Sequence, residues 1–190
     1  MILNKVSNFF ILLFPILISC EVYDSKHESN NDKKDSKISI IDPDTNKKYI
    51  YLPRSEGQMV HHNSYSLAYS EKHEQAIWVY YFLTSEMING KFSRTNNVRY
   101  DEKIINVSAT LSDYKGSGYD RGHLAPAADM KNSYISMSES FLFSNISPQV
   151  PSFNRVIWRK LESLIRHWVV SEGDAYIATG PILTDSLGSI

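Results

Sequence analysis

Hydrophobic residues in this chain gather in a few short runs that predict the strands of a sheet. Lys48–Leu52 and Ser64–Tyr69 carry alternating or β-rich patterns, which are typical of strands. The longer run Gln75–Thr84 is apolar and aromatic almost throughout, and this predicts a central strand that is fully buried. Near the C-terminus, Ala175–Thr179 has the composition of one more strand. The chain therefore predicts a sheet organised around one buried strand.

A different spacing predicts helices in two places. From about Ser152 to Val170, apolar residues recur at intervals of three and four, which indicates an amphipathic helix, and Pro151 suits its N-terminus. The apolar positions are Phe153, Val156, Ile157, Leu161, Leu164, Ile165 and Trp168. A shorter helix is predicted at Ser136–Phe143, with Ser136 or Ser138 as its N-cap.

The longer predicted helix has one polar and aromatic stripe. Asn154, Trp158 and Glu162 follow at i, i+4 and i+8, so a regular α-helix places an amide and a carboxylate on one side, where they could face a metal ion. Periodicity alone favours another interpretation, in which Glu162 is a solvated charge beside Arg159 and Arg166.

The N-terminus has the pattern of a targeting segment. Lys5 supplies a positive charge, and Phe9–Ile18 is an apolar stretch too short to span a bilayer comfortably. The stretch ends in Leu-Ile-Ser-Cys, which resembles the lipobox of bacterial lipoproteins. We therefore expect residues 1–19 to be a lipoprotein signal peptide and Cys20 to carry lipid. The alternative is a plain secretory signal with a chance cysteine, although Cys20 is the single cysteine and can form no internal disulfide.

Residues 20–37 are almost purely polar and predict a flexible tether, which leaves 38–190 as one domain. Of the 20 Lys and Arg residues, five precede residue 38, as do five of the 21 Asp and Glu residues, so the domain holds 15 cations against 16 carboxylates. Such a balance argues against a tight, passive binder of nucleic acid. It leaves room for an enzyme with a local basic cleft.

Candidate chemistry concentrates in Asp120-Arg121-Gly122-His123, which follows a segment with two glycines, Lys115–Tyr119. Histidine can accept a proton near neutral pH, and arginine offers a fork of donors that matches phosphate oxygens. Glycine between them lets the backbone come close or adopt a positive φ. The four residues together are suited to work on a phosphate.

Three further motifs follow in order, at residues 145–149 (NISPQ), 153–155 (FNR) and 158–162 (WRKLE). Together with DRGHLAPAAD they resemble the DNA/RNA non-specific endonuclease family, from about Tyr49 to the C-terminus and most densely between Gly118 and Glu162. The resemblance implies an α+β, ββα-metal nuclease fold with a central, mostly antiparallel sheet flanked by helices. Members of the family continue past the TGP element at residues 179–181 with a further strand and helices, so this chain is expected to be C-terminally truncated relative to them.

The resemblance also implies roles for individual residues. His123, on the ββ hairpin, matches the general base that activates water, and activity is expected to rise as it loses its proton above mildly acidic pH. Asn154 matches the one direct protein ligand of a hydrated divalent ion, Mg²⁺, for which Mn²⁺ can substitute. Glu162 matches a residue that holds the water molecules of that ion.

Phosphate contacts are expected from Arg121 and from a second arginine upstream. Arg94, in a polar loop after the predicted turn at Asn89-Gly90, matches the family arginine, and Arg99 competes for that role. Asn145 is expected to orient the hairpin or the phosphate. Within the DRGH motif, Asp120 is expected to fix the hairpin through the backbone beside Gly122.

The function expected from these features is a lipid-anchored, extracytoplasmic endonuclease that hydrolyses DNA and RNA without sequence specificity and needs no obligate protein partner. The outer membrane or the cell surface is the expected location. One alternative is a catalytically inactive, nuclease-like lipoprotein that binds nucleic acid or a protein. Another is an intracellular nuclease with an N-terminal membrane anchor. The adjacent His61 and His62 would point to opposite faces of a strand and are interpreted as surface or packing residues.

Overall fold

The structure is a computed structural model that describes residues 40–41, 48–49, 52–53, 55–106 and 108–184. The predicted signal peptide, Cys20 and the tether lie outside the described residues. A short antiparallel pair, β1 (Ile40–Ile41) and β2 (Lys48–Tyr49), belongs to a unit of its own, residues 12–52. Within the described part of the chain, no helix combines the length and apolar character needed to cross a membrane.

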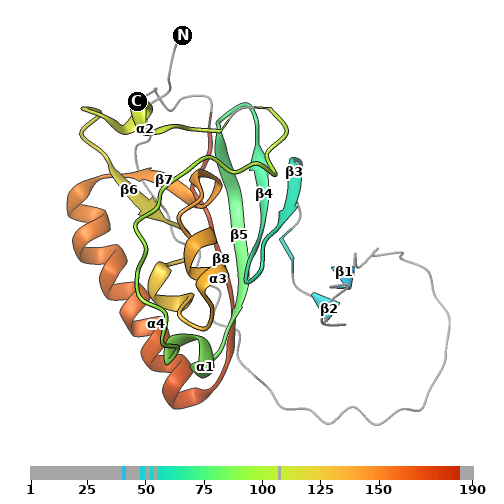
Figure 1. Ribbon diagram of the computed structural model, residues 1–190, viewed down its shortest axis with the longest axis vertical. Helices are drawn as coiled ribbons and strands as arrows, with labels where there is room; N and C mark the ends of the chain where they lie inside the picture. The colour runs from blue at the N-terminus through green and yellow to red at the C-terminus, as the bar shows by residue number, and fades with distance from the viewer. Residues whose placement is uncertain (1–39, 42–47, 50–51, 54, 107, 185–190) are drawn as a thin grey trace, which may run out of the picture. The chain divides into compact units, whose positions relative to one another are not determined.

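The main unit is built on a four-stranded antiparallel sheet (Figure 1). Its strands, in spatial order, are β3 (Gln58–His61), β4 (Ser66–Ser70), β5 (Gln75–Leu83) and β8 (Ala175–Thr179). The central position of β5 confirms the prediction from its long apolar run, because β5 pairs with a strand on each side and most of its side chains are buried.

One face of this sheet carries the core. Val79, Tyr81 and Leu83 alternate along β5 and point to the same face, as the two-residue period of a strand requires. Leu124 and Val169 pack with them from outside the sheet. The segment after the DRGH motif and the long C-terminal helix are thereby fixed against β5.

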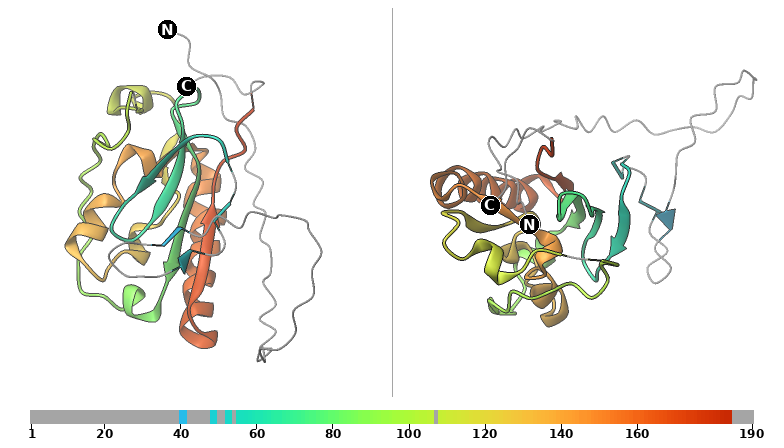
Figure 2. Two further views of the ribbon diagram at one scale, coloured as in Figure 1. Left: turned by 90° about the vertical axis from the view of Figure 1, so that its right-hand side faces the viewer. Right: turned by 90° about the horizontal axis from the view of Figure 1, so that it is seen from above.

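A second antiparallel pair holds the DRGH motif itself. Strand β6 (Asp120–His123) pairs with β7 (Ile146–Gln149), with Gly122 opposite Ser147 and His123 opposite Ile146. Directly after β7 comes a helix, and Figures 1 and 2 show it on the side of the large sheet where β6 and β7 also lie. The order strand, strand, helix is the one that the motifs predicted. Between β6 and β7 lie η1 (Ala127–Asp129), α3 (Tyr134–Glu139) and η2 (Phe143–Asn145), while α1 (Ser85–Ile88) and α2 (Leu111–Tyr114) precede β6.

The long helix differs from the prediction in its register. Its first part, η3 (Phe153–Trp158), is a π-helical turn, and the regular α-helix α4 runs from Arg159 to Glu172. A π turn bonds residue i to i+5 and so rotates everything after it relative to an unbroken α-helix. Trp158 and Val169 are buried on the observed inner face, whereas Val156, Ile157, Leu164 and Trp168 of the predicted apolar stripe are exposed.

The short helix α3 begins earlier than predicted. Its N-cap is Ser133, whose hydroxyl accepts a hydrogen bond from the Ser136 amide, so neither Ser136 nor Ser138 caps it. The hydroxyl of Ser136 is instead engaged by Asn63 and Ser64 from the β3–β4 turn. Serine recurs in this segment at several equally suitable positions, and a tertiary contact decides which of them is the cap.

The interpretation of His62 as a packing residue takes a specific form in the structure. Its ring is buried, with Nε2 2.9 Å from the Asp101 carboxylate and Nδ1 3.6 Å from that of Glu139. Burial alone would lower the pKa of His62, but the hydrogen bond with Asp101 and the nearby carboxylate of Glu139 outweigh it and raise that pKa. The interaction with His62 in turn lowers the pKa of both carboxyl groups against the effect of burial. The three side chains join the β3–β4 turn to α3 and to the loop after Arg99.

This buried cluster predicts how stability depends on pH. A histidine with a raised folded-state pKa contributes fully below its ordinary value of 6.5, and the contribution disappears as pH rises through the raised value. The lowered pKa of Glu139 makes its contribution full above its ordinary 4.5 and lost as pH falls. We expect the contribution of His62 to the free energy of unfolding to decrease as pH rises above 6.5, measured by chemical denaturation at a series of pH values.

The matched variants are His62→Gln and, as a control, His167→Gln at an exposed position of α4. Removing His62 leaves two buried carboxylates without their cation, which costs about 3–5 kcal/mol near pH 6. The control should retain the stability and pH dependence of the parent chain. A His62→Gln protein with an unchanged pH dependence would show that another group controls it.

Candidate active site

The DRGH motif owes its shape to a close approach between β6 and β7. A Cβ atom placed on Gly122 would lie 2.0 Å from Cδ of Gln149, so no side chain fits at that position while the Gln149 amide crosses the hairpin. The glycine in the motif is therefore needed for close packing and not for a positive φ. Gln149 is 1% exposed, and among the described residues neither the nitrogen nor the oxygen of its amide has a hydrogen-bond partner.

His123 ends β6 with its ring inside the protein. Nε2 is shielded from solvent and has no hydrogen-bond partner in the described part of the chain. Burial, together with the positive charges of Arg94 and Arg121, lowers the pKa of His123 from 6.5 to about 3. The imidazole is consequently neutral throughout the physiological range. The lowered pKa of His123 places the loss of its proton below mildly acidic pH, while the expected dependence of activity on this proton stays a prediction.

Two aromatic residues position His123, one at its ring and one at its backbone. The Phe141 ring meets it edge to face, with 4.9 Å between centroids and an interplanar angle of 87°. The indole N–H of Trp158 donates to the backbone carbonyl of His123 at 3.1 Å, which ties the helix to the end of β6. Phe141 had no signal in the sequence beyond its apolar character, and only the fold brings it to the site.

Asp120 fixes the hairpin through side chains and not through the backbone, contrary to expectation. Its carboxylate accepts two hydrogen bonds from the Arg155 guanidinium, at 2.7 and 2.6 Å, and one from Nδ2 of Asn154 at 3.0 Å. The bonds from Arg155, and to a smaller extent the one from Asn154, lower the pKa of Asp120 and keep it ionised. Strand β6 is thereby cross-linked to η3.

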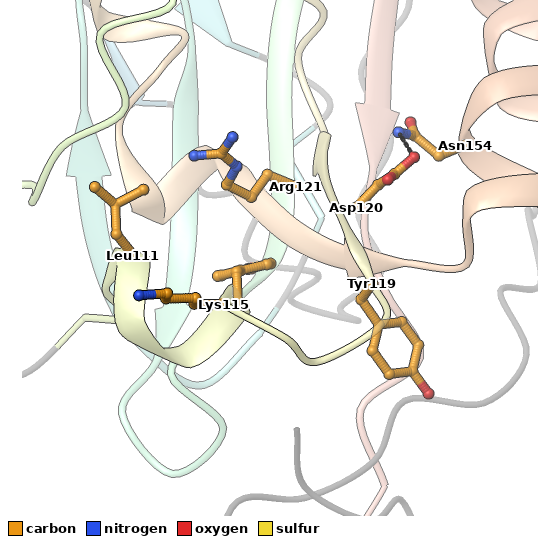
Figure 3. Close-up of a pocket in the computed structure, with 7 residues that line it drawn as sticks. Leu111, Lys115, Tyr119, Asp120, Arg121 and Asn154 are labelled. Atoms are coloured by element: carbon orange, nitrogen blue, oxygen red, sulfur yellow. Dashed lines mark hydrogen bonds between the residues drawn. The ribbon is translucent and has the colours of Figure 1, made fainter.

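This cross-link also orients the candidate metal ligand, as Figure 3 shows. Because a carboxylate can only accept, the Asn154 amide must turn its nitrogen toward Asp120, and its oxygen Oδ1 is left for another partner. An amide oxygen is a donor that hard divalent cations accept. The described residues contain no group of three or more His, Cys, Asp or Glu side chains that could hold a metal ion. The donor set fits a largely hydrated ion and not a protein cage.

Arg94 and Glu162 also lie at this site. The Arg94 guanidinium carbon lies 4.8 Å from the centroid of the Phe141 ring, the same ring that packs on His123. Burial, reinforced by the charge of Asp129 and only partly offset by Arg166 and Arg94, raises the pKa of Glu162 to about 7. Glu162 is therefore not a solvated helix charge, and its carboxyl group can gain or lose a proton near neutral pH.

Arg99 was the alternative to Arg94 for the phosphate-contacting arginine, but its side chain is bonded to α3. Its guanidinium donates to the carbonyl of Ser138 at 2.7 Å and so fastens the loop to the end of α3. Of the two arginines, the structure brings Arg94 to His123.

Asn145 stabilises the backbone around the hairpin and does not face a phosphate site. It is completely buried, and its amide donates to the carbonyls of Ala125 and Ser140 and accepts from the Ala125 amide. Both of its N–H groups are used by the backbone, so a direct catalytic role is not supported by this geometry. Its effect on His123 passes through the segment Leu124–Ala125.

Arg121 is exposed and lines a hollow of about 580 Å³ beside Asn154. The walls are formed by Leu111, Tyr114, Lys115, Tyr119, Asp120, Arg121 and Asn154. Figure 3 shows Asp120 and Asn154 on one side of this hollow, with Lys115 and Arg121 extending toward Leu111 on the other.

The site consists of an antiparallel strand pair with a buried histidine ring, followed by a helix whose Asn154 is hydrogen-bonded to the first strand. This arrangement is that of the ββα-metal class of nuclease fold. Comparison with known proteins agrees with this class. Residues 43–189 match the sequence family described as DNA/RNA non-specific endonuclease, and the chain belongs to that family. Membership implies a divalent metal cofactor.

Individual relatives support the same assignment. Human mitochondrial endonuclease G is 38% identical over 127 residues, which are 66% of this chain and 43% of that protein. A nuclease of Nostoc sp. is 39% identical over 121 residues, 63% of this chain and 44% of that protein. A chain in the crystal structure of the EndoG/EndoGI complex has a TM-score of 0.62 at 30% identity, covering 72% of this chain and 59% of that one. The predicted α+β fold is confirmed, and the matched part spans less than half of the two relatives.

The contact between Gly122 and Gln149 gives a direct test of the hairpin. We expect Gly122→Ala to lower the free energy of unfolding by about 1–3 kcal/mol, because the new methyl group and the Gln149 amide cannot share the space. The double variant Gly122→Ala/Gln149→Ala should recover most of that loss, with Gln149→Ala alone as control. Urea denaturation gives the free energy of unfolding of the parent chain, the two single variants and the double variant. A double variant as unstable as Gly122→Ala would place the strain elsewhere.

Proposed function

We propose that the protein is a Mg²⁺-dependent endonuclease that hydrolyses phosphodiester bonds of DNA and RNA without sequence specificity. The observation that carries this proposal is His123, a neutral imidazole whose Nε2 has no partner among the described residues. The charges of Arg94 and Arg121 act on this imidazole, and its strand β6 binds Asn154 through Asp120. Family membership supports a nuclease, while the metal, the substrates and the residue roles belong to the proposal.

The chain's own residues divide the work of hydrolysis. Nε2 of His123 accepts a proton from the attacking water, for which the imidazole must be neutral beforehand. The charges of Arg94 and Arg121 bind the phosphate and stabilise the negative charge that develops on it. The same charges disfavour the imidazolium ion, so the base gives up its proton readily after each turnover.

Asn154 would hold the metal through Oδ1, with Glu162 receiving hydrogen bonds from metal-bound water. When bound, a divalent ion supplies Lewis-acid stabilisation of the phosphate and of the departing oxygen. Asp120 keeps the Asn154 amide in the required orientation, since rotation of that amide would break its bond to the carboxylate. Manganese, with similar ligand preferences, is expected to substitute.

Sequence independence follows from what the site offers to a substrate. The groups gathered around His123 are charges and amides suited to phosphate, which reports no base sequence. The alternative of an inactive, nuclease-like binder lacks a specific observation in its favour, because a binder has no need of a desolvated, neutral histidine. We further propose that Cys20 is lipidated and that the protein is exported to the outer membrane or the cell surface.

The lipid anchor is tested by growth with an alkyne-labelled palmitate analogue. The parent chain should incorporate the label, and Cys20→Ser should not. Label on the Cys20→Ser chain would contradict the anchor and favour another N-terminal attachment.

The base is tested by His123→Ala. We expect turnover of plasmid DNA and of RNA to fall by about 10²–10⁴-fold, as for loss of a general base, with circular dichroism unchanged. His167→Ala, at an exposed position of α4, is the matched control and should retain activity. Cleavage by the parent chain should stop in EDTA and return with Mg²⁺. Full activity of His123→Ala would place the base elsewhere, and a folded parent chain without any activity would favour the inactive binder.

Metal binding should depend on pH through Glu162. Because the pKa of its carboxyl group is raised to about 7 in the metal-free protein, the carboxyl is protonated in mild acid and must release that proton to accept metal-bound water. The apparent affinity for Mg²⁺ is expected to fall by up to about tenfold per pH unit below 7. Calorimetric titration of the His123→Ala protein at pH 6, 7 and 8 measures it. Glu162→Gln should bind more weakly with little pH dependence, and a parent affinity that is constant over this range would exclude the coupling.

A further inference from the structure

The segment that leads into the catalytic strand has features that hydrolysis at His123 does not use. Between α2 and β6 the chain passes through Gly116 and Gly118, with φ of +79° and +82°. No atom lies within 4 Å of a Cβ placed on either glycine, so the backbone here faces open space. Positive φ explains why the two positions are glycines, and the open space leaves their backbone accessible to a ligand.

The loop is held in this shape by its own hydrogen bonds. The Ser117 hydroxyl donates to the carbonyl of Tyr114 at 2.9 Å and accepts from the Tyr119 amide at 3.2 Å. The Ser117 amide donates to the same Tyr114 carbonyl. By contrast, the amide groups of Gly116 and Gly118 donate to no other part of the chain that the structure describes. Two backbone donors are thus available on a loop whose conformation is already fixed.

Cations stand at both ends of this glycine loop. Lys115 and Arg121 are exposed and line the same hollow, which continues to Asn154 (Figure 3). The one carboxylate on that wall, Asp120, is neutralised by the guanidinium of Arg155. The hollow therefore offers positive charge from Lys115 and Arg121, and the two free amides lie next to Lys115 on the adjoining loop. Positive charge together with backbone N–H donors is a combination that binds phosphate groups.

We propose that Lys115, with the amides of Gly116 and Gly118, binds a second phosphate of the nucleic-acid strand, next to the phosphate that is cleaved. This proposal rests on the proposed nuclease function and adds a substrate subsite to it. A strand that places one phosphate at Asn154 carries its neighbours along the same chain, and the hollow is continuous with that position. The subsite recognises the backbone alone, so it strengthens binding without adding sequence preference.

The first experiment measures binding without cleavage. The full chain with His123→Ala, in EDTA, is titrated against a fluorescein-labelled single-stranded 16-mer at several salt concentrations. Adding Lys115→Ala should weaken binding about tenfold, the usual effect of a charge-assisted hydrogen bond, and should reduce the slope of log affinity against log salt by about 0.7. Lys160→Ala is the matched control, because Lys160 is exposed and lies about half a turn away from Trp158 on the helix.

The second experiment separates this subsite from the chemistry. For the active chain, kcat/KM is compared between an oligonucleotide and a thymidine diester that contains a single phosphodiester. Lys115→Ala should lower the ratio of the two values about tenfold through KM, Lys115→Arg should restore most of it, and Lys160→Ala should leave it unchanged. Neutral methylphosphonate links can replace the phosphates of the oligonucleotide one at a time. One position should then weaken binding by the parent chain without weakening binding by Lys115→Ala.

The outcomes are distinguishable. If Lys115→Ala shows the same affinity, salt slope and substrate ratio as Lys160→Ala, the second phosphate site is overturned. A His123→Ala protein that binds no oligonucleotide would overturn it as well. In either case, metal-dependent cleavage of the single diester would leave the proposed nuclease function standing. Failure of that cleavage together with normal oligonucleotide binding would overturn the nuclease function and retain the phosphate site.

Discussion

The carboxylate of Asp120 is the link on which the geometry of the site depends. It receives hydrogen bonds from Asn154 and Arg155, and so fixes the start of β6 to the first turn of the helix. Trp158 makes a second attachment one π turn later, at the backbone of His123. With two attachments on one strand, the helix can neither slide nor rotate, and the amide of Asn154 stays in register with the imidazole. The helix residues of both attachments belong to the π turn, Phe153–Trp158.

Sequence reasoning recovered what depends on local pattern or on recognisable motifs. The buried strand β5 was predicted from its long apolar run, and the place of the DRGH motif on a ββ hairpin was predicted from the ordered motifs. The partner strand at residues 146–149, the π turn and the Ser133 cap were not predicted, and the preference for Arg94 over Arg99 rested on the family resemblance alone. Each is decided by groups distant in sequence, such as the Phe141 ring and the backbone of α3, that a local pattern does not contain.

A buried polar chain connects the core to the site and explains the state of Glu162. Asp129 accepts from the hydroxyl of Tyr81 on the central strand and from Arg166 on α4, both at 2.8 Å. Its negative charge adds to the burial that raises the pKa of Glu162. Both acids are influenced by Arg166, and the carboxyl of Glu162, with its raised pKa, takes up a proton more easily than a surface carboxyl would. A divalent ion bound nearby would oppose this shift, because a positive charge favours the carboxylate.

His123 and Glu162 respond in opposite ways to the same environment, and this separates their tasks. Burial suppresses the charged form of either group, so it lowers the pKa of the imidazole and raises that of the carboxyl. Arg94 strengthens the first shift and opposes the second, since a cation repels imidazolium and attracts carboxylate. In the proposed mechanism, the imidazole of His123 is therefore neutral at physiological pH, whereas the carboxyl of Glu162 ionises fully only when a further cation lies nearby. The proposed activity on a polyanion is therefore compatible with a nearly neutral domain. It requires only the few cations proposed to contact phosphate, Arg94, Arg121 and Lys115, while the charges on the rest of the surface balance.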